Sequence, residues 1–236
     1  MPGSAPNRHQ KSLEGIDFFQ GIPEAVRASI ERRCRWQSVG ANERIIEYLD
    51  DSDDIFFLVS GKARVMMYSA SGRIVAFHDL KSGKMFGEYA AIDGGVRSAS
   101  VEALEPCQLA SMSSSEFWAL LAEQPTFTKF VMRHLVEEIR TLTRRVFEFS
   151  TLAVRNRTQA ELLRLAREAP PTSNTAHIKN APTHEEIASR ISTHRQAVTT
   201  EFNRLAQIGL IEQRARTLII KDVARLQRMV GEATGE

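Results

Sequence analysis

The 236-residue sequence is poor in cysteine and has no long apolar run, and each shortage excludes a class of protein. Two cysteines, Cys34 and Cys107, are too few for a four-thiolate metal cluster or a zinc knuckle. No apolar run approaches the ~20 residues that a membrane-spanning helix needs. Residues 1–12 lack the apolar core of a secretion signal, so we expect them to form a loose tail. We therefore expect a cytoplasmic protein that contacts no membrane and keeps both thiols reduced in its core.

Signatures of catalysis and of metal binding are also missing. The sequence contains no GxxxxGKS or GxxxxGKT loop, no HExxH and no GxSxG, and no nucleophile stands beside a base. His78 is a lone histidine in a strand-like run, which is more often structural than a haem ligand. The aspartates Asp50, Asp51, Asp53 and Asp54 lack the glycine and glutamate of a calcium loop, so they predict a solvated turn. We expect neither an enzyme nor a metal site.

The residues that are present describe a globular chain with an uneven charge. Apolar residues make up 42% of it and charged residues 25%, as in an ordinary water-soluble domain. From Ser150 to the end, thirteen Lys and Arg face nine Asp and Glu, a net charge of +4 that leaves −2 for the rest. A basic C-terminal third beside a slightly acidic body indicates a nucleic-acid partner.

The N-terminal half changes from helical to strand-like patterns at Trp36. Helices are expected over residues 13–19 and 23–34, where apolar residues recur at helical spacing. The short β-type runs that follow are separated by turn residues, which predicts an antiparallel sandwich or roll. The expected strands are residues 36–39, 44–48, 55–60, 63–69, 74–80, 98–103 and 107–112.

Two helices are expected after the last of these strands. The first is capped by serines 113–115 and runs to Ala122, and the second starts at Pro125 and reaches about Ser150. Apolar residues recur along the second at steps of three and four, the spacing of a coiled coil. They are Met132, Leu135, Ile139, Leu142, Val146 and Phe149. This stripe suits pairing with a second copy or packing on the chain's own strands.

The C-terminal third carries two helix-start signals in close succession. A helix over residues 153–168 ends in the polar loop 169–174, where prolines stop it. Thr183 with Glu186, and Thr193 with Gln196, then form two capping boxes. The second of these helices would end near Gly209. Two capped helices joined by a tight turn are a helix-turn-helix arrangement.

A hairpin and a surplus of basic residues follow the helix pair. Residues 210–213 and 217–220 predict a hairpin wing, and Asp222 caps a last helix. A small helical docking domain without DNA is the alternative. The surplus of positive charge argues against it: Arg190, Arg195, Arg204, Arg214, Arg216 and Lys221 face only Glu201 and Glu212.

The stretch from residue 85 to residue 103 has the composition of a nucleotide-binding loop. Gly87 precedes Glu88 and a short apolar run that can form one helical turn, and Arg97 with Ser98 closes the segment. Backbone N–H groups at a helix start attract an anion, to which Arg97 can add a guanidinium, whereas Glu88 suits a ribose hydroxyl. A loop that binds one phosphate and one ribose hydroxyl suits a cyclic nucleotide better than a nucleoside triphosphate. The alternative is a Glu88–Arg97 ion pair that braces a turn.

The order of FGE, a short helix and then RSA resembles the phosphate-binding cassette of the cyclic-AMP receptor protein family, the CRP/FNR superfamily of bacterial transcription regulators. With the long helix and the helix-turn-helix, the resemblance spans nearly all of the chain beyond the tail. It implies an α+β fold. The implied parts are a tail (1–12), a β-roll cyclic-nucleotide-binding domain (13–124), a long dimerisation helix with its hinge (125–152) and a winged helix-turn-helix DNA-binding domain (153–236).

The resemblance also assigns site residues. The implied nucleotide-binding residues are Gly87, Glu88, Tyr89, Ala90, Arg97, Ser98, Ala99, Leu142 and Thr143. The implied DNA-binding residues are Thr183, Ser192, Thr193, His194, Arg195, Gln196, Thr199, Thr200, Arg204, Arg214 and Arg216. Departures from the family occur at Gln196, where glutamate is frequent, and at Thr200, which replaces an arginine. On the long helix only Thr143 keeps a hydroxyl, because Leu142 occupies the other base-contacting position.

The implied function is that of a homodimeric transcription regulator without enzyme activity. Cyclic AMP, with cyclic GMP second, would bind each roll and allosterically place two recognition helices on a palindrome of double-stranded DNA. RNA polymerase is a further implied partner, with residues 171–176 as its contact surface. Two alternatives stay open. One is a DNA-binding regulator with a vestigial cassette, active without nucleotide, and the other is a cyclic-nucleotide module that regulates an enzyme or channel by contact.

Overall fold

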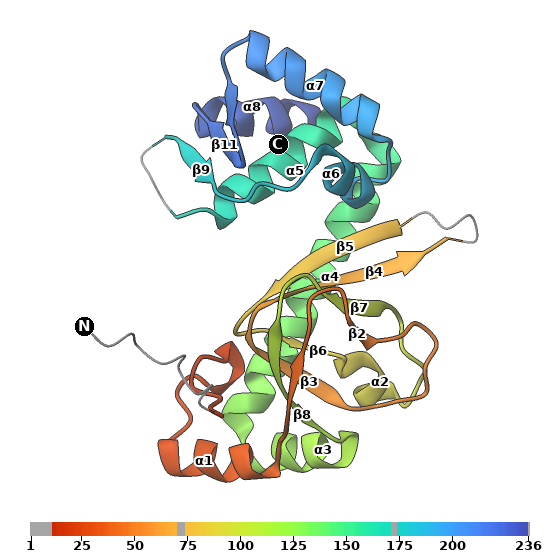
Figure 1. Cartoon of the computed structure of the whole chain (residues 1–236), viewed down its shortest axis with the longest axis vertical. Helices are drawn as coiled ribbons and strands as arrows, with labels where there is room; N and C mark the ends of the chain where they lie inside the picture. The colour runs from red at the N-terminus through yellow and green to blue at the C-terminus, as the bar shows by residue number, and fades with distance from the viewer. Residues whose placement is uncertain (1–10, 70–73, 171–173, 236) are drawn as a thin grey trace. The chain divides into compact units, whose positions relative to one another are not determined.

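Helices and antiparallel strands are combined throughout the computed structural model, which describes residues 11–69, 74–170 and 174–235 (Figure 1). The chain separates into two compact units, Met1–Glu137 and Glu138–Glu236. The boundary falls inside the longest helix, α4 (Pro125–Thr151). Of the expected tail, residues 1–10 lie outside the described residues. None of the described helices is both long and apolar enough to cross a membrane.

The first unit is built on two four-stranded antiparallel sheets, with strand orders β1-β8-β3-β6 and β2-β7-β4-β5 (Figure 1). The first sheet contains β1 (Arg35–Val39), β8 (Cys107–Met112), β3 (Ile55–Ser60) and β6 (Met85–Phe86). The second contains β2 (Arg44–Ile46), β7 (Ser100–Ala103), β4 (Lys62–Tyr68) and β5 (Ile74–Lys81). The predicted roll is confirmed, and only the two-residue β6 was not expected.

The two faces of strand β3 lie in two different hydrophobic cores. Successive side chains of a strand point to opposite faces. Phe56 and Leu58 accordingly pack in a core that both sheets share, and Ile55 and Phe57 pack in a second core under the helices. Cys107 lies in the first core and Cys34 in the second, and both are free thiols. Burial raises the pKa of the Cys34 thiol to about 12.

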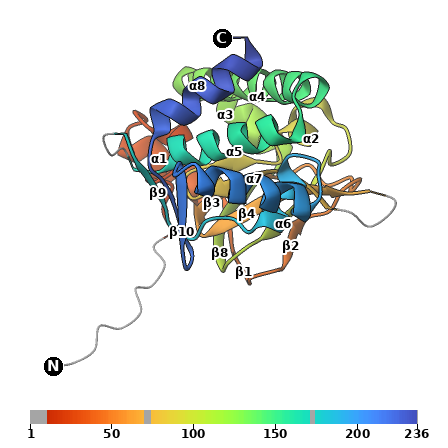
Figure 2. The same ribbon diagram turned by 90° about the horizontal axis from the view of Figure 1, so that it is seen from above.

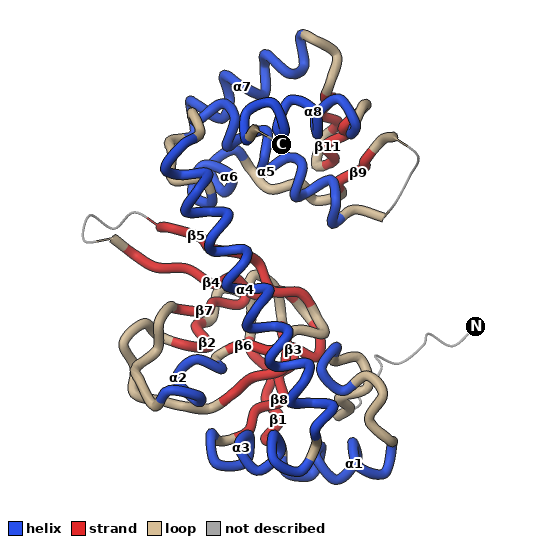
Figure 3. The backbone as a smooth tube through the Cα atoms, turned by 180° about the vertical axis from the view of Figure 1, so that it is seen from behind, coloured by secondary structure: helices blue, strands red, loops and turns tan. Residues whose placement is uncertain are grey.

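Helices α1 (Glu24–Arg33), α3 (Ser114–Glu123) and the start of α4 contribute to the second core (Figure 3). Phe127 and Val131 bring α4 into it. The helix expected over residues 13–19 is wrong, since only a 3-10 turn, Asp17–Phe19, forms. The Leu13 N–H donates to Glu31 Oε1 at 2.7 Å, which fixes this segment on α1 in place of a helix of its own.

The second unit combines helices with a three-stranded antiparallel sheet of order β10-β11-β9. Its strands are β9 (Ala176–Ile178), β10 (Ile211–Arg214) and β11 (Thr217–Ile220), and β9 was not expected. Its helices after α4 are α5 (Val154–Glu168), α6 (His184–Arg190), α7 (Arg195–Gln207) and α8 (Val223–Thr234). Helices α5 and α8 run side by side (Figure 2). As predicted, Asp222 caps α8 by accepting from the Arg225 N–H at 2.8 Å.

Helix α4 carries the apolar stripe that the sequence predicts, and most of it is exposed. Ile139 is 62% exposed and Val146 65%. Met132, Leu142 and Phe149 are exposed as well, whereas Leu135 is half-buried against the core under the helices. Packing within the unit therefore accounts for Leu135 alone, and the other stripe residues remain exposed.

Candidate functional site

Residues 87–99, called the cassette from here on, are closed by a contact between their two ends. Gly87 precedes α2 (Glu88–Asp93) with a φ of 83°, and Arg97 Nη1 donates to its carbonyl oxygen at 2.8 Å. A Cβ at position 87 would lie 2.9 Å from that same nitrogen. Glycine is therefore required here both by the left-handed backbone and by the approach of Arg97.

Arg97 is held from three sides by the protein itself. Its side chain is 2% exposed, and besides Gly87 it donates to the Asp54 carbonyl at 2.8 Å and to Ser52 Oγ at 3.1 Å. Burial lowers the pKa of the guanidinium, and the carboxylates of Asp54 and Asp50 partly oppose this. The acidic loop 50–54 is thus the support of Arg97, and no cluster of metal-ligating side chains gathers among the described residues.

Glu88 is buried at the start of α2 and faces helix α4. It is 6% exposed, and its Oε1 lies 3.3 Å from Nε2 of His134. The ring of Phe18 meets the His134 ring edge-on at 5.2 Å. Within the described part of the chain no ion pair joins Glu88 to Arg97, so the turn-bracing alternative lacks its contact. Nothing in the sequence around His134 indicates this role, because the pair spans 46 residues.

The remaining cassette residues differ in exposure. Ser98 and Tyr89 are exposed, Ala99 is half-buried, and Ala90 is 2% exposed. A buried Ala90 packs inside the unit and offers a ligand no side-chain surface. On α4, Leu142 and Thr143 are both exposed, and the Thr143 hydroxyl donates to the Ile139 carbonyl at 2.8 Å. Because its proton is used in this bond, the Thr143 hydroxyl oxygen can serve a ligand only as a hydrogen-bond acceptor.

The first helix of the predicted helix-turn-helix begins as the sequence indicates. The Thr183 N–H donates to Glu186 Oε2 at 2.8 Å, and the Glu186 N–H returns a bond to Thr183 Oγ1 at 3.2 Å. This reciprocal pair satisfies two N–H groups that the helix cannot bond internally. The capping box at α6 is confirmed.

The second capping box, Thr193 with Gln196, is wrong. Helix α7 begins one residue later, with His194 as its N-cap and no side-chain cap. Thr193 is buried, and its N–H donates to the Ala188 carbonyl of α6 at 2.9 Å. Ser192 takes a φ of 51° to make this tight turn. Packing between the helices thus overrides the local capping signal, and of these two residues only Ser192 is exposed.

The exposed start of α7 is formed by His194, Arg195, Gln196 and Thr200. Thr199, expected to face outward, is half-buried, and its Oγ1 lies 2.9 Å from Nδ1 of His184. Asn203 is exposed and lies seven residues after Gln196, so it extends the same face although the sequence analysis missed it.

The basic residues of the second unit fall into two groups. Arg195, Arg214, Arg216 and Lys221 are exposed, although Arg214 and Lys221 both pair with Glu212. Arg204 is half-buried and donates twice to Glu201, at 2.8 and 2.7 Å. Arg190 is 8% exposed and donates to Glu161 at 3.2 Å, so its inclusion in the basic surface is wrong.

Arg190 belongs to a buried charge network that the sequence did not reveal. Glu161 of α5 also accepts from Arg164 at 2.9 Å, and Arg164 donates to Glu148 of α4 at 2.8 and 3.0 Å. Burial acts to raise the pKa of Glu161, but the charges of Arg164, Arg190 and Arg145 outweigh it and hold this pKa below its ordinary value. The network ties α4 and α5 to the end of α6.

Comparisons with known proteins agree with this arrangement. The model of a cyclic nucleotide-binding domain matches residues 36–124, and that of a Crp-like helix-turn-helix domain matches residues 156–229. A cyclic AMP receptor protein from Thermus thermophilus is 27% identical over 222 residues, 92% of this chain and 98% of that protein. A CRP-like cAMP-activated global transcriptional regulator from Mycobacterium tuberculosis is 22% identical over 217 residues, 92% of this chain and 97% of that protein.

Solved structures share the fold. A CooA mutant from Carboxydothermus hydrogenoformans superposes with a TM-score of 0.76 at 20% identity, over 86% of this chain and 90% of that one. A c-di-GMP responsive global regulator from Xanthomonas campestris superposes with a TM-score of 0.70 at 18% identity, over 82% and 98%. At such identities the likeness shows the fold alone. The two family models together cover more than half of the chain, which therefore belongs to the cyclic-AMP receptor protein family, the CRP/FNR superfamily of bacterial transcription regulators.

Proposed function

We propose that this chain is a homodimeric transcription regulator whose DNA binding depends on a cyclic nucleotide. In this proposal residues 13–124 bind the nucleotide, residues 125–152 form the dimer helix and hinge, and residues 153–236 bind DNA. Cyclic AMP is the first choice of ligand and cyclic GMP the second. The nucleotide acts as an allosteric ligand and takes part in no reaction.

The observation that carries the proposal is the geometry of the cassette. A buried carboxylate, Glu88, stands at one end and a fixed guanidinium, Arg97, at the other, and the Arg97–Gly87 bond holds them together. A carboxylate accepts hydrogen bonds from ribose hydroxyls, and a guanidinium with the exposed Ser98 suits a phosphate. These residues fit a cyclic nucleotide, with Tyr89 and Ala99 at the rim and Ala90 as packing.

Base recognition is assigned to Leu142 and Thr143 on α4. The Thr143 oxygen can accept from an exocyclic amine, which both adenine and guanine carry, and Leu142 offers no hydrogen bond. We therefore expect weak discrimination, with cyclic AMP and cyclic GMP binding within about tenfold, or ~1.4 kcal/mol. A hundredfold preference measured by competition would contradict this part of the proposal.

The exposed stripe of α4 supports the dimer. Met132, Ile139 and Val146 recur at intervals of seven, as do Leu135, Leu142 and Phe149. Such a seam pairs with an identical helix. A second copy of the chain is the proposed occupant, because side chains as exposed as Ile139 and Val146 have much to gain from burial there.

The start of α7 is the proposed reader of DNA. Arg195 has the fork geometry to grip guanine O6 and N7, and Gln196 pairs best with adenine. Thr200 and Asn203 continue this face, and Thr183, Ser192, His194, Arg214 and Arg216 are exposed candidates for phosphate contacts. Thr193 and Thr199 are proposed only as supports of the helix pair, and Arg204 as a phosphate contact once it leaves Glu201. A two-fold dimer would place two such helices one helical turn apart, ~34 Å, on a palindrome.

The proposed mechanism is a two-state one. Nucleotide binding would reorient the residues between α4 and α5, Leu152 and Ala153, and so bring both recognition helices into register with DNA. A coupling free energy of ~1–3 kcal/mol between the sites is ordinary for allostery. A contact of RNA polymerase with residues 171–176 stays a prediction, and residues 171–173 lie outside the described residues.

One observation favours a second candidate, a regulator that binds DNA without nucleotide. Three N–H groups of Arg97 are already taken by protein acceptors, as they would be in a cassette that has become purely structural. Calorimetric titration of the purified chain with cyclic AMP separates the two. The main proposal predicts one nucleotide per chain, and no detectable binding would leave the vestigial cassette as the better account.

A further inference from the structure

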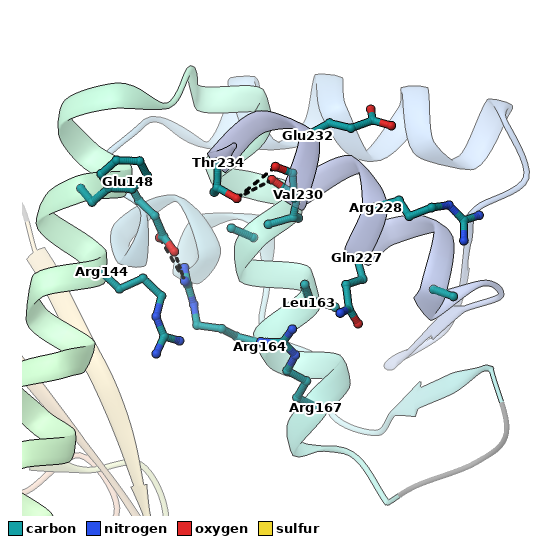
Figure 4. Close-up of a pocket in the computed structure, with 14 residues that line it drawn as sticks. Arg144, Glu148, Leu163, Arg164, Arg167, Gln227, Arg228, Val230, Glu232 and Thr234 are labelled. Carbon is teal, nitrogen blue, oxygen red and sulfur yellow. Dashed lines mark hydrogen bonds and ion pairs between the residues drawn. The ribbon is translucent and has the colours of Figure 1, made fainter. Parts of the chain in front are cut away.

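A cavity of about 790 Å³ lies in the second unit between α4, α5 and α8 (Figure 4). Its lining comes from the C-terminal part of α4, from one face of α5 and from most of α8. No cassette residue and no residue of α7 contributes to it. The cavity is therefore separate from both of the sites that the proposed function uses.

The lining is rich in positive charge. Four arginines, Arg144, Arg164, Arg167 and Arg228, stand against two glutamates, Glu148 and Glu232. Glu148 is already paired, because Arg164 donates to both of its oxygens at 2.8 and 3.0 Å. In the described part of the chain, Arg144, Arg167 and Arg228 make no ion pair with a carboxylate. The cavity thus offers unneutralised guanidinium groups on all three of its helices.

Arg164 is held in place from within the protein. Its Nη1 donates to Glu148 and its Nε donates to Glu161. Its Nη2 is buried without a hydrogen-bond partner. A buried polar nitrogen without an acceptor costs free energy, which a ligand oxygen that reached it would recover. Figure 4 shows Arg164 extending from α5 toward Glu148, with Arg144 of α4 drawn to its left. A fixed guanidinium beside exposed ones can bind an anion through charge-assisted hydrogen bonds.

The rest of the lining is apolar. Phe147 of α4, Leu163 of α5 and Val230 of α8 line the cavity, and Phe147 is 45% exposed although it lies outside the predicted dimer stripe. Sites for small molecules have volumes of ~300–1,000 Å³ and join an apolar wall to a few polar groups. The size and lining of this cavity match that class.

We propose that the cavity between α4, α5 and α8 is a second ligand site that takes a small organic anion of nucleotide size. The ligand carries a phosphate or clustered carboxylates for Arg144, Arg164 and Arg167, and an apolar or aromatic body for Phe147 and Leu163. A concave pocket with an apolar wall suits such a molecule.

Calorimetric titration of the full chain with 5′-AMP, and separately with citrate, tests the proposal. At least one of these two probes should bind, with one site per chain. The variant Arg144→Gln/Arg167→Gln removes two exposed guanidinium groups, and Ala224→Trp fills the cavity from an exposed position on α8 without a change of charge. Each should weaken binding by about tenfold or more.

Two controls make the outcome specific. Arg155→Gln removes a charge from an exposed position on α5 outside the cavity and should leave the affinity unchanged. Arg97→Leu should also leave it unchanged, because the cassette is a different site. The proposal is overturned if neither probe binds below about 5 mM, if the cavity variants bind like the wild type, or if Arg97→Leu abolishes binding at a temperature where the variant is folded. The last result would assign the probe to the cassette.

Discussion

Replacement of Arg97 by leucine should weaken both the first unit and nucleotide binding. Arg97 is 2% exposed and donates to the Gly87 and Asp54 carbonyl oxygens at 2.8 Å. A buried acceptor left without its donor costs ~1–3 kcal/mol, so two of them should lower the free energy of unfolding by ~2–6 kcal/mol. The corresponding fall in Tm is roughly 5–15 °C. Loss of the charge beside the phosphate should raise the Kd for cyclic AMP about 30- to 5,000-fold, or ~2–5 kcal/mol.

Two matched variants separate these losses. Arg97→Lys keeps the charge but cannot reach Gly87, Asp54 and Ser52 together, so it should lose as much stability and less affinity. Glu88→Ala removes hydrogen bonds to the sugar and should also cost less affinity than Arg97→Leu. Scanning calorimetry measures the Tm, and isothermal titration well below the lowest Tm measures the Kd. If folded Arg97→Leu binds cyclic AMP as tightly as the wild type, the cassette assignment is wrong.

Four further predictions concern the dimer, DNA and pH. Ile139→Asp places two like charges in an apolar seam and should yield monomers in sedimentation, whereas a monomeric wild type at micromolar concentration would refute the seam. Arg195→Ala should lose ~1–3 kcal/mol of DNA affinity and relax one base per half-site. In selection from random DNA, Gln196→Glu and the wild type should enrich different bases at the half-site positions nearest the centre of the palindrome. Identical enrichment would show that Gln196 does not read these bases. Burial, and then the charge of Arg195, lower the pKa of His184 from its ordinary 6.5. Because the unfolded chain then takes up the proton first, urea unfolding should show stability falling as the pH drops below that value, and His184→Gln should flatten this dependence. Equal slopes for both proteins would contradict it.

Local patterns predicted most of the fold because they act within a few residues. Strands β3 and β8 have the predicted bounds, since each is an apolar run between turn residues. The Thr183–Glu186 box formed because its two reciprocal bonds join residues that are only three positions apart. Strand β9 was missed because three residues carry too little pattern, and it forms only through its pairing with β11.

The errors in the candidate site arise from contacts between distant residues. Thr193 has the same capping signal as Thr183, yet packing against α6 buries it and the helix starts later. Arg190 counts as a basic residue in the sequence, but its partner Glu161 stands 29 positions earlier and holds it inside the unit. Two of the three acceptors of Arg97 likewise come from outside the cassette, from residues 52 and 54. Sequence can therefore supply the residue types of a site, while tertiary packing decides which of them stay accessible.

The central claim is that cyclic nucleotide binding in the cassette increases affinity for DNA. The most direct measurement is the Kd of the purified chain for its selected palindrome, with and without saturating cyclic AMP, for the wild type and Arg97→Leu. The account predicts that cyclic AMP tightens binding about 5- to 150-fold in the wild type, the range expected for a coupling of ~1–3 kcal/mol, and leaves Arg97→Leu unchanged. An equal wild-type Kd with and without the nucleotide would contradict the account.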